Sequence, residues 1–502
     1  MMYQLPASLK NKKNLEWALL AFFIIAASAI RLHTNFSTKF IPGNNGAYYL
    51  VQARSLLENG RLQFVEFPLL FWLEAGLAWI FFHLGFGNID SSVDFASRLF
   101  DSIIPVLSII PAYALTKRII GNERKIYSAA IISSLSVLYF SPLMLISDFQ
   151  KNALGVLWLF CLMYWLYRSF EESSRKNLLI TFLFLLLTGL THYGCISVAV
   201  TLVLLNLILK YELRYTFKRF LRVVSSIIII VVICIGIVYI TSPFRTMVFI
   251  NIPLEIFRNP IIFFILQHKP VISPLDMINI LLVNFVAIIS LILFIKNFAT
   301  LEIKTRPFIL ACIILAFFLA SPFLGIDAAQ RLYFMSYLPV IPLLPFIYKN
   351  ISASVAKNSV TSTILLIIIF SIFIVIGKGT QSNMNEKLYS ELVEMKKVIP
   401  ANGKSIIVAR HGMEFWSAWI FRTDVTRQES LNENYWRAYA NVLFLQQKKD
   451  KSSFGPAGMI GRPFPEPTLP EFSQSIFTGD YFDFYKSPTP PKSFFIFMEK
   501  RP

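Results

Sequence analysis

Long apolar runs, separated by short clusters of lysine and arginine, dominate this chain. Runs of about 17 to 25 mostly apolar residues are long enough to cross a bilayer as helices. Hydrophobic residues make up 55% of the 502 positions and charged residues only 15%, less charge than a soluble protein of this length carries. The runs are continuous rather than alternating, which excludes a β-barrel. The sequence therefore predicts a polytopic α-helical membrane protein.

The many positive charges of the chain lie between its apolar runs. Lysine and arginine number 47 against 29 acidic residues, a formal net charge of +18. A nucleic-acid-binding protein would gather such charges on a soluble face with aromatic residues between them. Here they lie in the short loops between apolar runs, where the positive-inside rule places cytoplasmic charge. We expect a membrane topology and membrane lipids as partners, with no nucleic acid.

The placement of residues 67–87 decides the topology. If this run crossed the membrane, the cluster Lys117, Arg118, Arg124 and Lys125 would lie outside, against the positive-inside rule. We therefore expect residues 67–87 to form an interfacial or re-entrant helix on the outer face and residues 95–115 to form the second span. About eleven spans result, with the N-terminus in the cytoplasm.

The later part of the chain divides into a membrane region and a polar end. The apolar stretch 177–209 is too long for one crossing and is expected to break at His192, near the outer boundary. The last span is expected at about 359–376. Residues 1–376 then form the transmembrane module, with a first outer loop at 33–94, and residues 377–502 form a small extracytoplasmic α/β domain.

That C-terminal domain is expected to rely on an apolar core, because all four cysteines lie in the apolar runs and none lies after residue 376. The periodicity predicts helices at 385–398 and 411–420, strands at 405–409 and 494–498, and a further ordered segment at 440–446.

The first outer loop has a recognisable order of motifs. Residues 42–50 read Pro-Gly-Asn-Asn-Gly-Ala-Tyr-Tyr-Leu and open a helix that includes Tyr49, is expected in the membrane interface, and ends at Gly60. Glu66-Phe67-Pro68 then opens the second interfacial helix, and the next span carries Arg98 early. This order resembles the GT-C superfamily of membrane glycosyltransferases, which includes protein O-mannosyltransferases and the aminoarabinose transferase of lipid A.

The resemblance covers most of the chain and implies a reaction. Family members use a polyprenyl-phosphate sugar as donor, so no separate cofactor is expected. An acidic residue just after the first span acts as base or orients the acceptor. The matching position here is Asn45 or Asn44, and an amide can bind a sugar hydroxyl but cannot take its proton. Alternatively, either asparagine simply caps the following helix.

A second acidic position of the family, at the outer turn after the third span, matches Asp148. We predict Asp148 as the general base or acceptor-orienting carboxylate, with Glu66 as the second candidate. The alternatives are a helix cap paired with Lys151 for Asp148 and a solvated interfacial carboxylate for Glu66.

A lipid phosphate needs a cation at the outer membrane edge, preferably arginine because its guanidinium binds two oxygens at once. Arg331 fits best, with a structural pair to Asp327 as the alternative. Lys151 and Arg98 are weaker candidates, and Arg98 could equally anchor its span. His192 could bind the phosphate or transfer a proton, although a histidine in a turn is more often structural.

Residues 409–416 follow a predicted strand and open a helix, where a turn can present polar groups to a ligand. We expect a lid or acceptor-recognition role for this segment. No cluster of carboxylates or histidines has the spacing of metal ligands, so no metal site is predicted.

The sequence leaves three functions open. The first is a glycosyltransferase that moves a sugar from a polyprenyl-phosphate carrier to a lipid, glycan or protein on the outer face of a bacterial-type inner membrane. The second is a non-catalytic relative that binds a lipid-linked glycan, suggested by Asn45. The third, a transporter or flippase, is disfavoured because the ionisable residues gather at one membrane face and no inverted repeat is found.

Overall fold

The computed structural model describes most of the chain: residues 7–121, 126–172, 174–212, 256–267, 273–351, 354–378, 382–448 and 465–488, with 236 and 490. Its contacts divide the chain into two compact units. Unit 1 contains Met1–Ile30, Ile103–Leu145 and Lys151–Lys378. Unit 2 contains Arg31–Ser102, Ile146–Gln150 and Gly379–Pro502. The first outer loop thus belongs to the same unit as the C-terminal region, although the sequence analysis grouped it with the transmembrane module.

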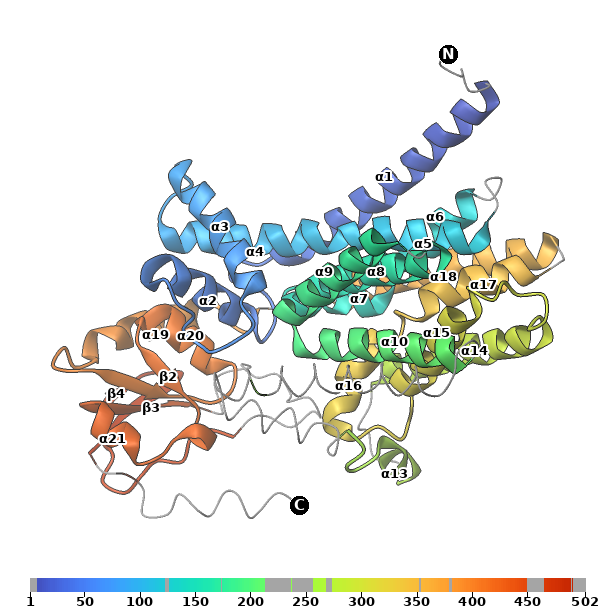
Figure 1. Ribbon diagram of the computed structural model, residues 1–502. Helices are drawn as coiled ribbons and strands as arrows, with labels where there is room; N and C mark the ends of the chain where they lie inside the picture. Colours follow the sequence, from blue (N-terminus) through green and yellow to red (C-terminus); the bar gives the residue numbers. More distant parts are fainter. Residues whose placement is uncertain are drawn as a thin grey trace. The chain divides into compact units, whose positions relative to one another are not determined.

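Unit 1 is made of helices (Figure 1), and their bounds follow. They are most of α1 (Ala7–Phe36), the 3-10 helix η1 (Ile104–Ser108), α5 (Ile109–Ile120), α6 (Ile126–Leu138), α7 (Phe140–Met144), α8 (Gln150–Glu171), α9 (Arg175–Thr191), α10 (Tyr193–Glu212), α13 (Ile261–Leu266), α14 (Pro274–Lys296), α15 (Arg306–Leu319), α16 (Ile326–Met335), α17 (Val340–Asn350) and α18 (Ser354–Lys378).

Seven helices of the described chain are long and apolar enough to cross a membrane, by length and composition. They are Asn14–Phe36, Ile89–Ile120, Tyr127–Met144, Gln150–Glu171, Tyr193–Lys210, Pro274–Lys296 and Val355–Gly377. The prediction of an integral, mostly helical membrane protein is confirmed. The count of about eleven spans stays a prediction, and residues 213–235 and 237–255 lie outside the described part.

Several predicted boundaries can be compared with the helices observed. The stretch 177–209 breaks as expected, since α9 ends at Thr191, α10 begins at Tyr193, and His192 between them has an extended backbone. The second span is longer than the predicted 95–115, because α4 (Ile89–Ile103) continues through η1 into α5. Arg98 therefore lies in the third turn of α4 rather than at its start.

Unit 2 combines two helices of the first outer loop with a small mixed sheet. The loop forms α2 (Gly46–Asn59) and α3 (Leu69–His83). The C-terminal region contributes α19 (Glu386–Met395), η3 (Lys396–Val398), α20 (Met413–Phe421), η4 (Gln428–Ser430), α21 (Asn434–Ala438) and five strands. In the order β2-β1-β3-β5-β4, the strands are β2 (Asp424–Thr426), β1 (Ser405–Val408), β3 (Asn441–Gln447), β5 (Phe482–Ser487) and β4 (Gln474–Thr478).

The sheet has a parallel half and an antiparallel half. Strand β1 pairs in parallel with β2 and β3, while β5 pairs antiparallel with β3 and β4. All four residues of β1 are buried, as expected for a central parallel strand covered on both faces. The predicted strand at 405–409 and the two predicted helices are confirmed, and the segment 440–446, whose type was left open, forms β3. The predicted strand at 494–498 lies outside the described residues, and β2, β4 and β5 were not predicted.

Helix α2 was expected in the membrane interface, and its first ten residues are buried within the protein. Every residue from Gly46 to Ser55 is buried, including the polar Gln52 and Arg54. Helix α3 covers one side of α2 and α20 covers another. The contacts of Arg54 explain why this charged side chain is buried. Arg54 donates to the carbonyl oxygens of Trp419 (2.8 Å) and Ala418 (2.9 Å) and lies over the Trp419 ring at 4.2 Å.

This contact gives a test of how the first outer loop and the C-terminal region hold together. Replacing Arg54 by methionine keeps an apolar stem but leaves two carbonyl oxygens of α20 without their charged donor, a loss of about 3 kcal/mol in the free energy of unfolding. We expect a lower melting temperature in detergent and an early change in tryptophan fluorescence. Arg61→Met is the control, because Arg61 is exposed. Equal melting temperatures for both variants would contradict the interpretation.

Candidate functional site

The candidate site forms where the turn 146–150 meets the start of the first outer loop, all within unit 2. The Asp148 Oδ1 atom accepts hydrogen bonds from the backbone N–H groups of Asn44 and Asn45, each at 2.7 Å. The Asn45 side chain and the Tyr49 hydroxyl donate to the Asp148 carbonyl oxygen at 3.4 Å and 3.3 Å. The structure thus brings together four of the predicted residues.

Gly43 allows this approach. Its φ is +81°, a left-handed conformation that glycine adopts without steric cost. A Cβ atom at this position would lie 2.9 Å from both Cγ and Oδ1 of Asp148. The turn before Asn44 therefore needs glycine for two reasons, backbone conformation and space for the carboxylate.

The asparagines do not act as the helix cap that the sequence left open. Asn45 occupies the N-cap position of α2, but its side chain makes no capping hydrogen bond and reaches Asp148 instead. The Asn383 side chain, from the segment after α18, donates to the Asn44 side chain. Both amides therefore line the site, as amides that bind hydroxyl groups would.

The turn that presents Asp148 is strained and held by a buried ion pair. Ser147 has a φ of 65°, which costs a non-glycine residue about 1 to 2 kcal/mol. Its N–H donates to Asp101 Oδ2 at 2.9 Å and its hydroxyl donates to the Pro42 carbonyl at 2.6 Å. Asp101 in turn pairs with Arg31 at 2.7 Å, with both side chains almost fully buried. This support was not predicted, because single acidic and basic residues in apolar helices carry no spacing signal.

Burial raises the pKa of the Asp148 carboxyl, and the backbone N–H groups of Asn45 and Asn44 and the charge of His411 oppose that rise. A carboxylate that is partly desolvated and faces a charged partner is typical of acid–base sites. His411 belongs to the turn between β1 and α20. The next residue is Gly412, and a Cβ atom added there would lie 3.8 Å from the Asn44 carbonyl oxygen. The segment 409–416, expected to recognise a ligand, therefore faces this site within unit 2.

Glu66 lies next to the site through two tyrosines. It is half-buried, and its Oε2 atom accepts from the Tyr48 hydroxyl at 3.1 Å. Burial and then the Glu66 charge raise the pKa of Tyr48 well above its usual range, so the phenol stays a donor. The Tyr48 ring meets the Tyr49 ring at 5.3 Å and the Phe415 ring at 5.0 Å. These contacts do not fit the alternative that Glu66 is a solvated interfacial carboxylate.

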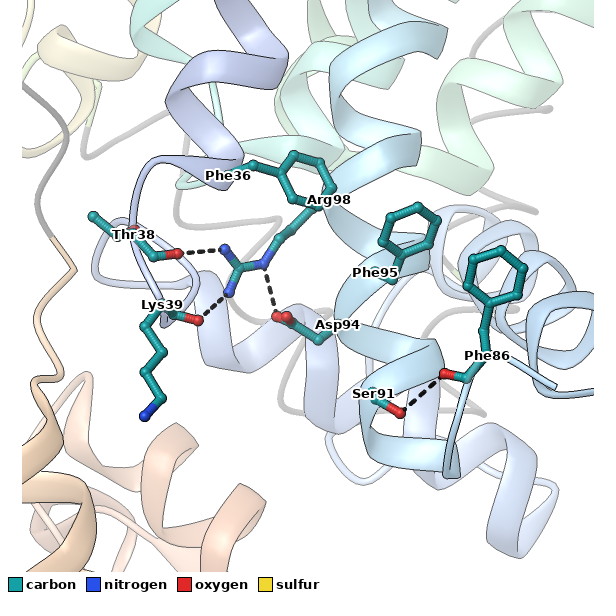
Figure 2. A pocket seen from close by; sticks show the side chains of 8 residues that line it. All are labelled: Phe36, Thr38, Lys39, Phe86, Ser91, Asp94, Phe95 and Arg98. Carbon is teal, nitrogen blue, oxygen red and sulfur yellow. Dashed lines mark hydrogen bonds and ion pairs between the residues drawn. The ribbon is translucent and has the colours of Figure 1, made fainter.

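Arg98 uses its donors to hold the backbone after α1, as Figure 2 shows. Its guanidinium pairs with Asp94 at 2.9 Å and donates to the carbonyl oxygens of Asn35, Thr38 and Lys39 at 2.7 to 3.0 Å. These contacts favour the anchoring alternative over phosphate binding. Arg98 also lines a pocket of about 370 Å³, together with Phe36, Thr38, Lys39, Phe86, Ser91, Asp94 and Phe95.

The predicted phosphate-binding residues Arg331, His192 and Lys151 belong to unit 1. The exposed Arg331 side chain donates to the Tyr193 hydroxyl, and the His192 ring packs on the Tyr193 ring at 4.6 Å. The Gly194 N–H donates to His192 Nδ1 at 3.2 Å, so that nitrogen is an acceptor. Tyr193, which was not predicted, thus joins two of the predicted residues.

Two of the alternative pairings involve residues of unit 1: Arg331 with Asp327, and Asp148 with Lys151. The Asp327 side chain, the alternative partner of Arg331, lies outside the described residues. Lys151 lies half-buried in the first turn of α8.

Among the side chains that the structure describes, no group of three or more His, Cys, Asp or Glu residues could hold a metal ion.

Comparison with known proteins gives a structural likeness. No family model and no curated protein matches the chain. The crystal structure of ArnT from Cupriavidus metallidurans bound to undecaprenyl phosphate is similar, with a TM-score of 0.48, 11% identity, and coverage of 94% of this chain and 99% of that chain. At this identity and TM-score the likeness assigns neither an activity nor a residue role to this chain.

The close fit at Gly43 can be tested by a matched pair of substitutions. Gly43→Ala adds the cost of a left-handed alanine, about 1 to 2 kcal/mol, and also displaces the Asp148 carboxylate. Gly60→Ala has a similar φ of +66° but open space around the new methyl group. We expect a clearly larger fall in melting temperature for Gly43→Ala. Equal effects would show that the Asp148 contact contributes nothing.

The raised pKa of Asp148 predicts how stability depends on pH. A carboxyl whose pKa is higher in the folded than in the unfolded state stabilises the fold at low pH, and this stabilisation is lost as pH rises through the folded-state pKa. Asp148→Asn keeps an Oδ1 acceptor for both N–H groups and removes the titration. At pH 7.5 we therefore expect Asp148→Asn to melt at the same temperature as the native chain or higher.

Toward pH 4 that advantage should disappear, because the native carboxyl is then protonated. Melting curves across this range check the sign. Glu429→Gln, at an exposed carboxyl, serves as the control and should follow the native curve. An Asp148→Asn protein that is less stable at pH 7.5 than at pH 4, relative to native, would reverse the prediction.

Proposed function

We propose that this chain is a GT-C-type glycosyltransferase that moves a sugar from a polyprenyl-phosphate carrier to a lipid, glycan or protein acceptor. The observation that supports it most is the Asp148 carboxylate drawn onto the backbone of Asn44 and Asn45 at the start of the first outer loop. The residues after the first span carry no acid of their own, and this contact supplies one from the turn before α8. A carboxylate, as the resemblance leads us to expect after the first span, thus lies beside the asparagines at that position.

The reaction follows from the groups present. Asp148, with the amides of Asn44 and Asn45, would orient a hydroxyl of the acceptor for attack on the anomeric carbon. The bond from that carbon to the carrier phosphate breaks, and the phosphate leaves with its electron pair. As a separate part of the proposal, Arg331 in unit 1 is a phosphate ligand, since a guanidinium matches phosphate oxygens. The donor serves as substrate, and no separate cofactor is part of the proposal.

The orientation is part of the same proposal. The N-terminus would lie in the cytoplasm of a bacterial-type inner membrane, with unit 2 on the outer face. Helix α3 supports this placement, because one side of it packs in unit 2 and the other exposes Trp72, Trp79 and Phe82. Tryptophan-rich faces are typical of the membrane–water interface.

Transfer of radiolabelled sugar from polyprenyl-phosphate donors, in membranes that contain the chain, tests the function. We expect Asp148→Asn to reduce transfer by about 100-fold or more, because proton transfer and orientation by a placed carboxylate contribute about that factor. Arg331→Ala should raise the KM for the donor more than it lowers kcat, and Arg331→Lys should restore part of the loss. Arg61→Ala is the control variant.

The outcomes separate the candidate functions. Native activity that neither variant changes would remove these residues from the mechanism. A chain that binds the carrier lipid tightly but transfers no sugar would favour the non-catalytic function that the amides of Asn44 and Asn45 suggest. Neither binding nor transfer with any donor would contradict the proposal.

A further inference from the structure

The proposed function needs a group that takes the proton of the acceptor hydroxyl. Asn44 and Asn45 are amides and cannot accept that proton. Asp148 Oδ1 already accepts two backbone N–H groups at 2.7 Å, and Glu66 Oε2 accepts from the Tyr48 hydroxyl. A second proton acceptor near Asp148 would complete the site.

The turn between β1 and α20 provides a histidine in a suitable arrangement. It follows the carboxyl end of β1, which lies between two parallel neighbours, the region where α/β sheets commonly bind ligands. His411 Nδ1 lies 2.9 Å from Glu414 Oε1, one helical turn further along the chain. The Glu414 side chain is only 2% exposed, whereas the His411 side chain is 25% exposed. The histidine can therefore reach a substrate while its partner stays fixed inside.

A second contact holds the Glu414 side chain in place. Arg427 Nε donates to the same Oε1 atom at 2.6 Å. A buried carboxylate against Nδ1 keeps the proton on that nitrogen and leaves Nε2 as the basic one, as in other carboxylate–histidine pairs. The geometry of Arg427, Glu414 and His411 thus sets the tautomer that a base requires.

The surroundings place this histidine at the Asp148 site rather than elsewhere in unit 2. The backbone at Gly412 approaches the Asn44 carbonyl, and the His411 ring meets Phe415 at 5.8 Å. Phe415 in turn packs on Tyr48, the partner of Glu66. Among the charges near His411 are Asp148 from the turn before α8 and Glu414 from α20, with Arg427 behind Glu414.

We propose that His411, held by Glu414, is the proton acceptor of this site and that Asp148 orients the acceptor hydroxyl toward it. This inference rests on the proposed transferase function. As the hydroxyl oxygen bonds to the anomeric carbon, its proton passes to His411 Nε2, and the bond from the anomeric carbon to the phosphate oxygen breaks with its electron pair going to the phosphate. The two carboxylates, Asp148 and Glu414, stabilise the imidazolium that results. Glu414 is a positioning residue in this scheme.

The kinetic test compares His411→Gln and Glu414→Gln with His83→Gln, a control at an exposed histidine of α3. We expect His411→Gln to lower kcat by about 100-fold or more with little change in the KM for the donor. The dependence of kcat/KM on pH should differ between His411→Gln and the native chain, because the variant lacks the proton acceptor. Glu414→Gln should lower kcat by about 10-fold or more while the protein stays folded. A purely structural role would change the melting temperature but leave the shape of the pH profile.

If the native chain transfers sugar and His411→Gln has the native rate and pH profile, the inference is wrong and the proposed function stands. A second measurement needs no turnover: the rate at which diethyl pyrocarbonate labels His411 at pH 6, read by mass spectrometry. Glu414 holds the ring through Nδ1 and Asp148 lies near it, so removal of either carboxylate should change the labelling rate, in Asp148→Asn and Glu414→Gln but not in Glu429→Gln. Equal labelling rates in all four proteins would overturn the inference, whatever the activity.

Discussion

The hydrogen bonds from the backbone of Asn44 and Asn45 to the Asp148 carboxylate join two parts of the chain that are about a hundred residues apart. They are possible only because Gly43 adopts a positive φ and leaves room for the carboxylate. The turn that carries Asp148 is strained at Ser147, and the buried pair of Asp101 and Arg31 supports it. Strain that the surrounding structure maintains is a common feature of functional sites.

The C-terminal region contacts the first outer loop at several places within unit 2. Arg54 of α2 binds two carbonyl oxygens of α20 and stacks on Trp419, while Arg422 pairs with Glu58 and Asp90 from the first outer loop. Buried charged groups are stable only when their hydrogen bonds are satisfied. These contacts therefore define one relative position of the loop helices and α20, and that position brings the turn with His411 to the loop with Asn44.

Much of the chain's architecture was predictable because hydrophobic length and charge distribution are local signals. The helical membrane region, the break at His192, the helix that ends at Gly60, and the strand–helix pair around residue 410 all follow from periodicity and turn residues. Strand β4 escaped prediction because a short, largely exposed segment resembles a loop in sequence. The buried state of α2 was not predictable either, since the carbonyl groups that Arg54 binds lie more than 360 residues away.

The candidate site also combines features that the sequence predicts with features that only the tertiary structure shows. The sequence by itself determined that Asp148, Glu66 and the two asparagines were unusual residues for a membrane edge, and it determined the resemblance to GT-C enzymes through the order of motifs in the first outer loop. It singled out the segment around His411 without linking it to Asp148. Only the tertiary structure decided that the amides at 44 and 45 present their backbone to Asp148 and that Glu414 lies behind His411. Such pairings depend on side chains from distant segments meeting in one place, and the free energy of that meeting comes from burial and from hydrogen bonds that no local pattern records.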